Sequence, residues 1–305
     1  MNLFTIRDGW IAKLQTGSVA VGARCAILDN GDVLCTFMAQ SALGINDFVP
    51  MQTVSHDNGN TWDEPRPIWP HLRDRFSLFC SVSRNHAGTL FLYGIRFSID
   101  APGELFWSDA TQGMKENDLF WACSADDGHT WTEPNVIPMP IPGAAEAPGA
   151  LCVTRSGRWL ACYAPYNTFD PAVKVDRNQI VLLSSDDEGA SWQHHDFIRF
   201  PEENSGGAEA WVVELADGRL LGTCWQVAHT PGQEFSNPFT ISSDEGETWS
   251  SVQSTGIMGQ STALAALPDG RALFVYNQRK QGEPGVYLAI AQPREFDFGI
   301  ESNQI

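Results

Sequence analysis

The octamer SSDEGETW, Ser242–Trp249, has a pattern that returns three more times in the chain. The pattern is S-x-D-x-G-x-x-W, with a serine, an aspartate, a glycine and a tryptophan at constant spacing. A pattern written four times is either a catalytic motif in several copies or a part of the architecture. The other three copies are SHDNGNTW at 55–62, SADDGHTW at 124–131 and SDDEGASW at 185–192.

The octamers lie at long, regular intervals among strand-like segments. Their glycines are 69, 61 and 57 residues apart. Five times, two apolar runs flank a glycine that can adopt the positive φ of a tight hairpin turn. A third apolar run precedes each octamer, and a fourth strand is expected after each tryptophan. Such repeated four-stranded units predict a β-propeller. The turn glycines are Gly31, Gly88, Gly157, Gly218 and Gly270.

Each octamer is expected in the hairpin between a third and a fourth strand. There the aspartate accepts amide hydrogens, the glycine supplies an unusual backbone angle, and the serine closes the turn. The tryptophan is expected to pack between neighbouring sheets. Copies spread around a rim cannot converge on one substrate, so the octamers are predicted to be architecture.

These octamers are Asp boxes, and from Val19 to about Gln292 the chain resembles the sialidase superfamily of BNR-repeat proteins. The resemblance implies a single β-propeller domain over residues 1–305, with four-stranded antiparallel blades. Six blades are expected, with five as the alternative, because about 17 residues at the start and about 12 at the end would make only a thin sixth blade. The fifth unit reads AQPREFDFG where a box should stand. The same frame carries sialidases, other glycosidases, polysaccharide lyases and non-catalytic proteins, so it does not decide the reaction.

The composition of the chain limits the kinds of partner that it is expected to bind. The formal net charge of −18 disfavours nucleic acid and anionic membrane surfaces. No apolar run approaches the roughly 20 residues of a membrane span, and no signal peptide is evident, so a cytoplasmic location is expected. The seven cysteines lack metal-ligand spacing and are expected to be buried hydrophobic residues. No metal or cofactor is predicted, and the oligomeric state stays open.

Residues of a propeller site come from the innermost strands and from the ends of the second strands. Two consecutive units, GAAEAPGAL and GGAEAWVVEL, place Glu146 and Glu209 before an innermost strand. Paired carboxylates suit acid/base chemistry, because proximity raises one pKa; the alternative is that each is a solvated loop carboxylate. The remaining candidates are Arg24, Asp47, Arg96, Tyr166, Trp225, Gln226, His229, Asn277 and Arg279.

The sialidase resemblance implies roles for three of these residues. Arg24 in ARCAIL matches the arginine that opens the first blade, although the proline of the family motif is missing. Asp47 matches the acid/base aspartate before the first box strand, and Glu209 in EAWVVEL matches the glutamate that polarises a tyrosine nucleophile. Ordinary alternatives are a salt-bridging strand residue for Arg24 and a turn former for Asp47.

The chain also departs from the family pattern. Trp225 and Gln226 stand where a second arginine is expected, and Arg279 offers the third arginine at a shifted position. The nucleophilic tyrosine should open a sixth blade; Tyr166 and Tyr276 are the nearest tyrosines, and neither matches the motif.

Three functions therefore compete. The first is an exo-acting glycosidase of sialidase type that binds a carboxylated terminal sugar through arginines. The second is a polysaccharide lyase in which His229 or Tyr166 removes a proton. The third is a non-catalytic carbohydrate-binding propeller. The missing motif residues favour the last two, and the presence of Arg24, Asp47 and Glu209 together favours the first.

Overall fold

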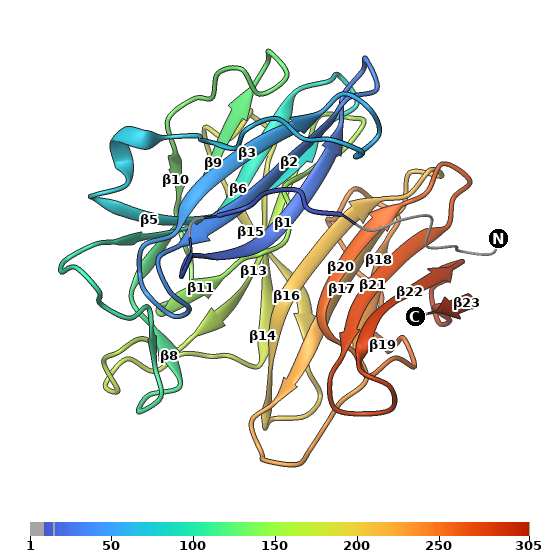
Figure 1. Cartoon of the computed structure of the whole chain (residues 1–305). Helices are drawn as coiled ribbons and strands as arrows, with labels where there is room; N and C mark the ends of the chain where they lie inside the picture. Colours follow the sequence, from blue (N-terminus) through green and yellow to red (C-terminus); the bar gives the residue numbers. More distant parts are fainter. Residues whose placement is uncertain (1–8, 15, 305) are drawn as a thin grey trace. The chain divides into compact units, whose positions relative to one another are not determined.

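The computed structural model describes residues 9–14 and 16–304, and almost all regular structure in them is β-strand. The strands form five antiparallel sheets of four or five strands and one two-stranded ribbon (Figure 1). This confirms the predicted all-β propeller of small antiparallel sheets. The number of sheets matches the five-bladed alternative. The C-terminal residues do not start a further blade, because they supply the outer strand of the fifth sheet, β23 (Ile300–Gln304).

The chain divides into two compact units, which are described separately. Of the described residues, unit 1 contains 154–165 and 176–304, and unit 2 contains the rest. That the whole chain is one domain stays a prediction.

Unit 2 contains two complete four-stranded sheets. In the first, the strand order is β1 (Val19–Ile27), β2 (Val33–Gln40), β3 (Val49–Ser55), β4 (Arg66–Pro67). In the second, the order is β10 (Asn135–Ile137), β9 (Asn117–Ser124), β6 (Leu90–Ser98), β5 (Phe76–Arg84). The shorter elements are the 3-10 helix η1 (Pro70–Leu72), the ribbon β7 (Trp107–Ser108) and β8 (Gly113–Met114), β11 (Ala144–Glu146) and β12 (Cys152–Val153).

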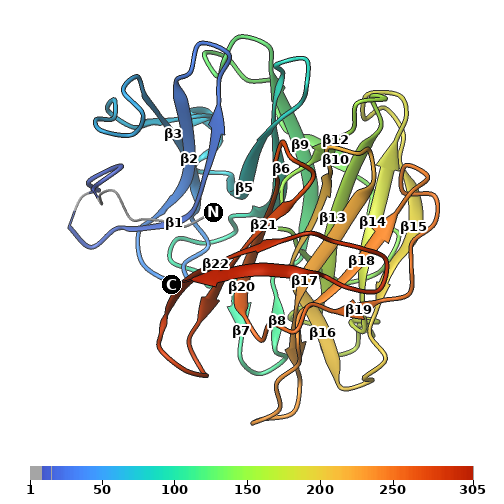
Figure 2. The ribbon, with the colours of Figure 1, turned by 90° about the vertical axis from the view of Figure 1, so that its right-hand side faces the viewer.

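Unit 1 contains the remaining strands, except that Tyr166, the last residue of β13, belongs to unit 2. Three strands lie side by side in the order β13 (Trp159–Tyr166), β14 (Gln179–Ser185), β15 (Gln193–Arg199) (Figure 2). The fourth sheet is β16 (Ser205–Glu214), β17 (Leu220–Ala228), β18 (Pro238–Ser242), β19 (Gln253–Ser254). The fifth is β20 (Gln260–Ala266), β21 (Ala272–Gln278), β22 (Gly285–Ala291), β23.

The four boxes have one hydrogen-bond pattern, and it confirms the predicted roles of the serine and the aspartate. The serine Oγ accepts from the glycine amide at 2.7–2.9 Å. The aspartate Oδ1 accepts the amide four residues later at 2.8–2.9 Å. Each box lies between a third and a fourth strand, and the strand expected after the tryptophan is present in every case.

These hydrogen bonds also affect the ionisation of the box aspartates. Bonds from Thr130 and Ser124 lower the pKa of Asp126 to about 2, and the pKa values of Asp57, Asp187 and Asp244 are lowered in the same way. A carboxyl with a lower pKa in the folded state stabilises the fold at neutral pH. That contribution is lost as the pH falls through the folded pKa.

Box residues approach their neighbours closely. Gly128 has φ +82°, and a Cβ there would come within 2.5 Å of the Leu34 side chain, so both the angle and the contact require glycine. Trp131 packs against the hydrophobic core of unit 2, and its Nε1 donates to Gln52 Oε1 at 2.7 Å. In unit 1, Trp249 meets Phe197 edge to face at 4.6 Å between ring centroids. Trp131 and Trp249 thus join neighbouring sheets, as predicted, whereas Trp192 meets Trp159 of its own sheet.

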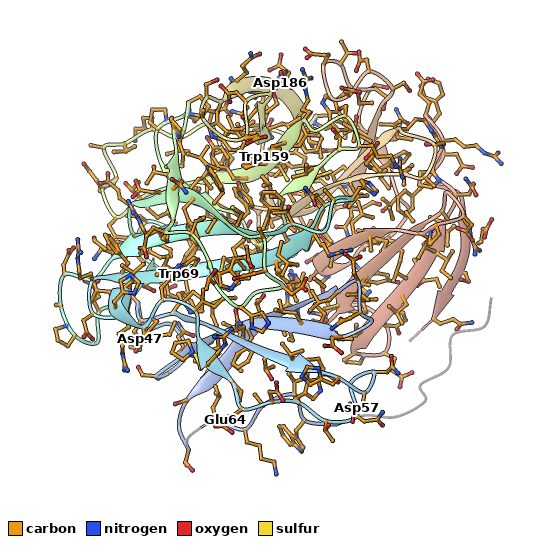
Figure 3. All side chains as sticks on the ribbon, turned by 90° about the horizontal axis from the view of Figure 1, so that it is seen from above. Asp47, Asp57, Glu64, Trp69, Trp159 and Asp186 are labelled. Atoms are coloured by element: carbon orange, nitrogen blue, oxygen red, sulfur yellow. The ribbon has the colours of Figure 1, made fainter. Side chains whose placement is uncertain are left out.

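The boxes and the loops that carry site candidates lie at opposite ends of the sheets. In the first sheet Asp47 precedes β3 and Asp57 follows it (Figure 3). A seven-residue strand rises about 3.3 Å per residue, which separates its two ends by roughly 20 Å. The box of this sheet therefore cannot contact a ligand bound at Asp47.

The prediction for the cysteines is confirmed only in part. Cys35, Cys80, Cys162 and Cys224 are buried as expected, whereas Cys123 and Cys152 are half-buried. Cys25 is exposed, because it occupies an outward position of β1, where side chains alternate between the two faces of the sheet.

We expect Trp131→Ala to lower the free energy of unfolding by about 3 kcal/mol, the lower end of the range for aromatic truncation, because the ring is half-buried. Denaturant titration followed by circular dichroism measures the loss. Trp10→Ala is the control, since Trp10 is 80% exposed and should change stability little. Equal stability of the two variants would contradict the structural role of the box.

Candidate functional site

The predicted site residues are divided between the two units. None of these positions belongs to a box. Unit 2 carries Arg24, Asp47, Arg96, Glu146 and Tyr166, and unit 1 carries Glu209, Trp225, Gln226, His229, Asn277 and Arg279. Each group is described within its own unit.

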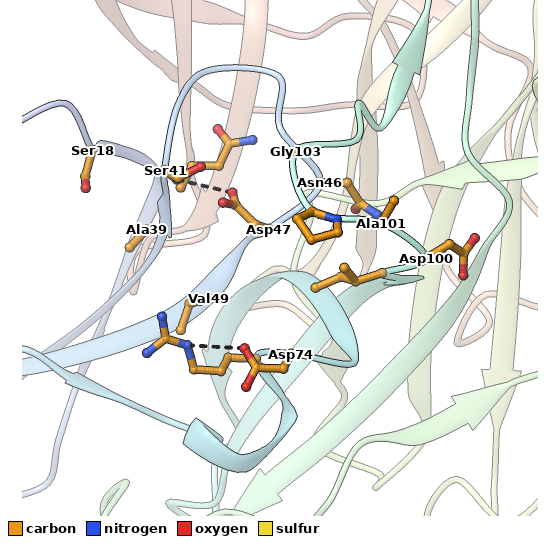
Figure 4. A pocket seen from close by; sticks show the side chains of 14 residues that line it. Ser18, Ala39, Ser41, Asn46, Asp47, Val49, Asp74, Asp100, Ala101 and Gly103 are labelled. Atoms are coloured by element: carbon orange, nitrogen blue, oxygen red, sulfur yellow. Dashed lines mark hydrogen bonds and ion pairs between the residues drawn. The ribbon is translucent and has the colours of Figure 1, made fainter.

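A cleft of about 690 Å³ opens in unit 2 beside Asp47 (Figure 4). Its lining mixes polar and apolar residues and bears charges of both signs. Arg73 and Asp74 come from the segment after η1, and Asp100 comes from the loop after β6. The Arg73 side chain is 67% exposed, so its guanidinium is accessible to a ligand in the cleft.

Hydrogen bonds hold the loop that carries Asp47. The Ser41 amide donates to Asp47 Oδ1 at 3.2 Å, and Gln40 Nε2 donates to the Ile45 carbonyl at 2.6 Å. Asn46 is buried, and its Nδ2 donates to the Ser98 carbonyl and to Glu104 Oε1. Asp47 is thereby placed at the edge of the cleft with its carboxylate partly exposed.

A half-buried lysine, Lys115, supports the wall of the cleft at Asp100. Lys115 Nζ lies 2.7 Å from Asp100 Oδ2 and 2.6 Å from Glu104 Oε1. The hydrogen bond from Lys115 lowers the pKa of Asp100. Burial would raise the pKa of Glu104, but hydrogen bonds from Lys115 and Asn46 lower it. Both carboxylates are therefore ionised at neutral pH and hold the loop after β6 in place.

Arg24 lies within β1 at a β-bulge rather than at the start of the strand. The register shifts between Val21 and Arg24, and Gly22 adopts φ +65° there. A Cβ at Gly22 would meet Met38 at 2.5 Å and Phe79 at 2.8 Å, so the bulge requires glycine. Arg24 is half-buried, and its Nη1 donates to the Ala23 carbonyl at 2.9 Å.

The other candidates of unit 2 have neighbours inside the unit. Arg96 Nη2 lies 2.6 Å from Asp118 Oδ2, and its guanidinium covers the Phe76 ring at 4.5 Å. Tyr166 is half-buried and packs edge to face on Trp107. Glu146 is the last residue of β11 and is half-buried. The charge of Arg96 is thus balanced within its own sheet.

Two of the bulges in unit 1, those of β16 and β20, contain a residue in the left-handed region. Glu209 in β16 has φ +51°, and Ser261 in β20 has φ +52°. Thr262 Oγ1 donates to the Glu209 carbonyl at 3.0 Å, and Trp211 Nε1 donates to the Thr262 carbonyl at 2.8 Å. These bonds tie the two bulges together and hold Glu209 in a conformation that costs a non-glycine residue about 1–2 kcal/mol.

Arg279 lies beside these bulges. Its guanidinium is 5.7 Å from the ring centroid of Trp225, and its backbone amide donates to Gln260 Oε1 at 2.9 Å. Its Nη2 reaches Ser261 Oγ at 3.4 Å. Since Trp225 is opposite Ala208, the neighbour of Glu209, the arginine, the indole and the glutamate belong to one region of unit 1.

The remaining candidates of unit 1 differ in their environment. Gln226 is buried and donates to Glu202 Oε2 at 2.8 Å and Ser205 Oγ at 3.0 Å, so it supports a loop. His229 follows β17 with its ring near Gly206; burial and then the charge of Arg177 lower its pKa. Asn277 is half-buried in β21, opposite Gln260.

Sequence reasoning missed Ser261, Arg73 and Lys115. Ser261 could have been found by aligning GQSTALAAL with GAEAWVVEL, which puts Ser261 at the position of Glu209. Arg73 and Lys115 carry no sequence signal, because Arg73 reaches the cleft, and Lys115 reaches Asp100 beside it, from loops whose course depends on the tertiary fold. No group of three metal-ligating side chains is found in residues 9–14 and 16–304, and no helix there is long and apolar enough to cross a membrane.

Comparison with known families shows to which family the chain belongs. The model of the BNR repeat-like domain matches residues 80–296, more than half of the chain. The chain belongs to the BNR repeat-like domain family. A search of curated proteins gives no match.

Solved structures show the same fold at low sequence identity. A protein of unknown function from Dyadobacter fermentans is 19% identical, with a TM-score of 0.72 over 92% of this chain and 80% of that one. NanB sialidase from Streptococcus pneumoniae is 17% identical, with a TM-score of 0.64 over 97% and 63%. An α-L-arabinanase from Penicillium chrysogenum is 16% identical, with a TM-score of 0.61 over 91% and 80%. The chain spans less than two thirds of the NanB structure.

The strain at Glu209 has a measurable consequence. We expect Glu209→Gly to be more stable than Glu209→Ala by about 1 kcal/mol, because only glycine adopts φ +51° without steric cost. Denaturant unfolding of the two variants gives the difference. Glu203, the control position, is exposed and lies outside the left-handed region. There the glycine variant should be less stable than the alanine variant. A Glu209→Gly variant less stable than Glu209→Ala would contradict the strain.

Proposed function

We propose that this member of the BNR repeat-like domain family is a glycoside hydrolase of sialidase type that cleaves a terminal, carboxylated sugar. The observation that carries the proposal is Glu209, a carboxylate held at φ +51° by hydrogen bonds from a neighbouring strand. Strained non-glycine residues persist where the surrounding structure fixes them, and they cluster at functional sites. The sialidase and arabinanase folds of the structural neighbours are consistent with this class of reaction.

Arg279 and Trp225 supply the recognition chemistry. A guanidinium beside an indole offers charge-assisted hydrogen bonds to a carboxylate and an apolar face to a sugar ring. Arg279 is exposed, so a ligand can reach it. The chain has a net charge of −18, but salt screens distant charges more strongly than close ones. Arg279 can therefore still attract a carboxylate that lies next to it.

Glu209 would activate a nucleophile or a water molecule, and its rigid position on β16 would preserve the geometry that this step requires. The role of Asp47 as general acid is a separate proposal, which rests on its partly exposed position at the edge of the cleft in unit 2.

Two other functions have support from single observations. The pKa of His229 is lowered, which makes its ring neutral at pH 7 and suited to remove a proton in a lyase. Arg96 pairs with Asp118, and Gln226 donates to Glu202, so both side chains are engaged within the protein. Side chains engaged in this way favour a binding protein over an enzyme that uses them on its substrate. Product analysis separates the three: a lyase forms an unsaturated sugar that absorbs ultraviolet light, a hydrolase releases free sugar without that absorbance, and a binding protein forms neither.

We expect Glu209→Gln to cut turnover of an aryl α-sialoside by about 10²–10⁴, the usual contribution of a positioned acid or base, while ligand affinity stays nearly unchanged. Initial rates and calorimetric binding of free sialic acid measure the two quantities. Glu203→Gln is the control, because Glu203 is exposed and outside the bulge. Full activity in Glu209→Gln would refute the assignment.

We expect Arg279→Ala to weaken binding of a carboxylated sugar by about 1.5–3 kcal/mol, the value of a hydrogen bond to a charged group, and to affect the matching neutral alcohol far less. Calorimetry with both ligands gives the comparison. Lys280→Ala is the control, since Lys280 is an adjacent cation paired with Glu234. Equally weakened binding of both ligands would rule out carboxylate recognition by Arg279. The same two measurements on Arg24→Ala and Arg96→Ala test the other two arginines.

A further inference from the structure

Two cysteines lie directly opposite each other in the first sheet. In the antiparallel ladder of β1 and β2, Cys25 is the register partner of Cys35. Directly opposite residues of an antiparallel pair have their side chains on one face and their Cα atoms about 4.5–5.5 Å apart. A disulfide accepts Cα separations of about 4.4–6.8 Å, so the backbone is already placed for a bond between the two sulfur atoms.

The two thiols influence each other's ionisation. The neighbouring Cys35 thiol and the Arg24 charge lower the pKa of Cys25, and the neighbouring Cys25 thiol and burial raise the pKa of Cys35. Cys25 is exposed, whereas Cys35, its register partner on the neighbouring strand, is buried and donates from Sγ to the Thr36 carbonyl at 3.8 Å. One thiol of the pair is thus accessible and more acidic, and the other is protected next to it, which is the arrangement of a nucleophilic and a resolving cysteine.

Three other strand cysteines have a different residue as register partner. Cys80 is opposite Gly94, Cys123 is opposite Phe91, and Cys162 is opposite Leu182. The pairing in the first sheet is therefore not a general result of having cysteines in strands.

We propose that Cys25 and Cys35 are a redox modification site that closes to a disulfide by exchange with a small disulfide such as oxidised glutathione. The Cys25 thiolate attacks one glutathione sulfur, forms a mixed disulfide and releases the first glutathione thiolate. Cys35 then loses its proton to solvent, attacks Cys25 Sγ and releases the second glutathione thiolate. In total, two protein thiols are oxidised to one disulfide and one glutathione disulfide is reduced to two thiols.

The bond would enclose the hairpin turn at Gly31 and would fix β1 to β2 beside Arg24 and the Gly22 bulge. A cross-link of this short loop restricts the unfolded chain, and the oxidised protein should melt up to about 5 °C higher than the reduced one. An exposed cross-strand bond is also open to attack by a thiol, so the reaction should be reversible.

The test uses the full chain, reduced and then equilibrated with oxidised glutathione at pH 8. Mass spectrometry of the intact protein should show the loss of two hydrogen atoms, and digestion should give a peptide that joins the Cys25 and Cys35 segments. Dithiothreitol should restore the starting mass. Cys123→Ser, the control, should behave as wild type, because Cys123 is half-buried and faces no cysteine.

Cys25→Ser replaces an exposed residue, so this variant should fold normally but form no cross-link. Cys35→Ala should retain glutathione on Cys25 as a stable adduct.

Three results would overturn the proposal. These are a stable glutathione adduct on Cys25 of the wild-type chain, no reaction of the native chain, or a Cys25–Cys35 bond that forms only after denaturation.

Discussion

The serine and aspartate of the Asp box provide the interaction on which the sheets depend. In each box the serine hydroxyl accepts the glycine amide, and the aspartate accepts the amide four residues later. These bonds close the hairpin between the third and fourth strands, and the closed hairpin presents Trp131 or Trp249 of its box to a neighbouring sheet. A turn that is closed by side chains on its own residues needs no help from distant parts of the chain. The box therefore forms the same geometry in sheets whose other residues differ.

This locality explains which parts of the fold could be predicted. The boxes, the strands before and after them, and the five turn glycines are recognisable in the sequence, because each depends on neighbouring residues. The bulges of β1, β16 and β20 are not, since an extra residue in a strand leaves the apolar pattern almost unchanged. Arg24 and Glu209 were accordingly expected at the starts of their strands and lie within them. The alternation in β1 likewise did not reveal that Cys25 faces outward.

The candidate site was harder to predict, because the state of a charged residue depends on partners far away in the sequence. Family resemblance selected Arg24, Asp47 and Glu209, and it gave no information about what each one contacts. Arg96 is balanced by Asp118 across the strand pair, and Lys115 secures two carboxylates beside the cleft. Arg279 differs from Arg96 in being exposed, which leaves its charge accessible to a ligand. Such differences follow from tertiary contacts and decide which residues of a motif can take part in binding.

The separation of the box from the cleft has a consequence for protein engineering. In the first sheet the box closes one end of β3, and the Asp47 loop begins at the other end. The segments 41–47 and 99–104 border the cleft and contribute no residue to a box. They can be exchanged or lengthened as cassettes while the closed end of each sheet stays intact. A library confined to these segments would vary the shape and charge of the cleft on a constant frame. The repeated hairpins thus give this architecture a means of acquiring new ligands without a new core.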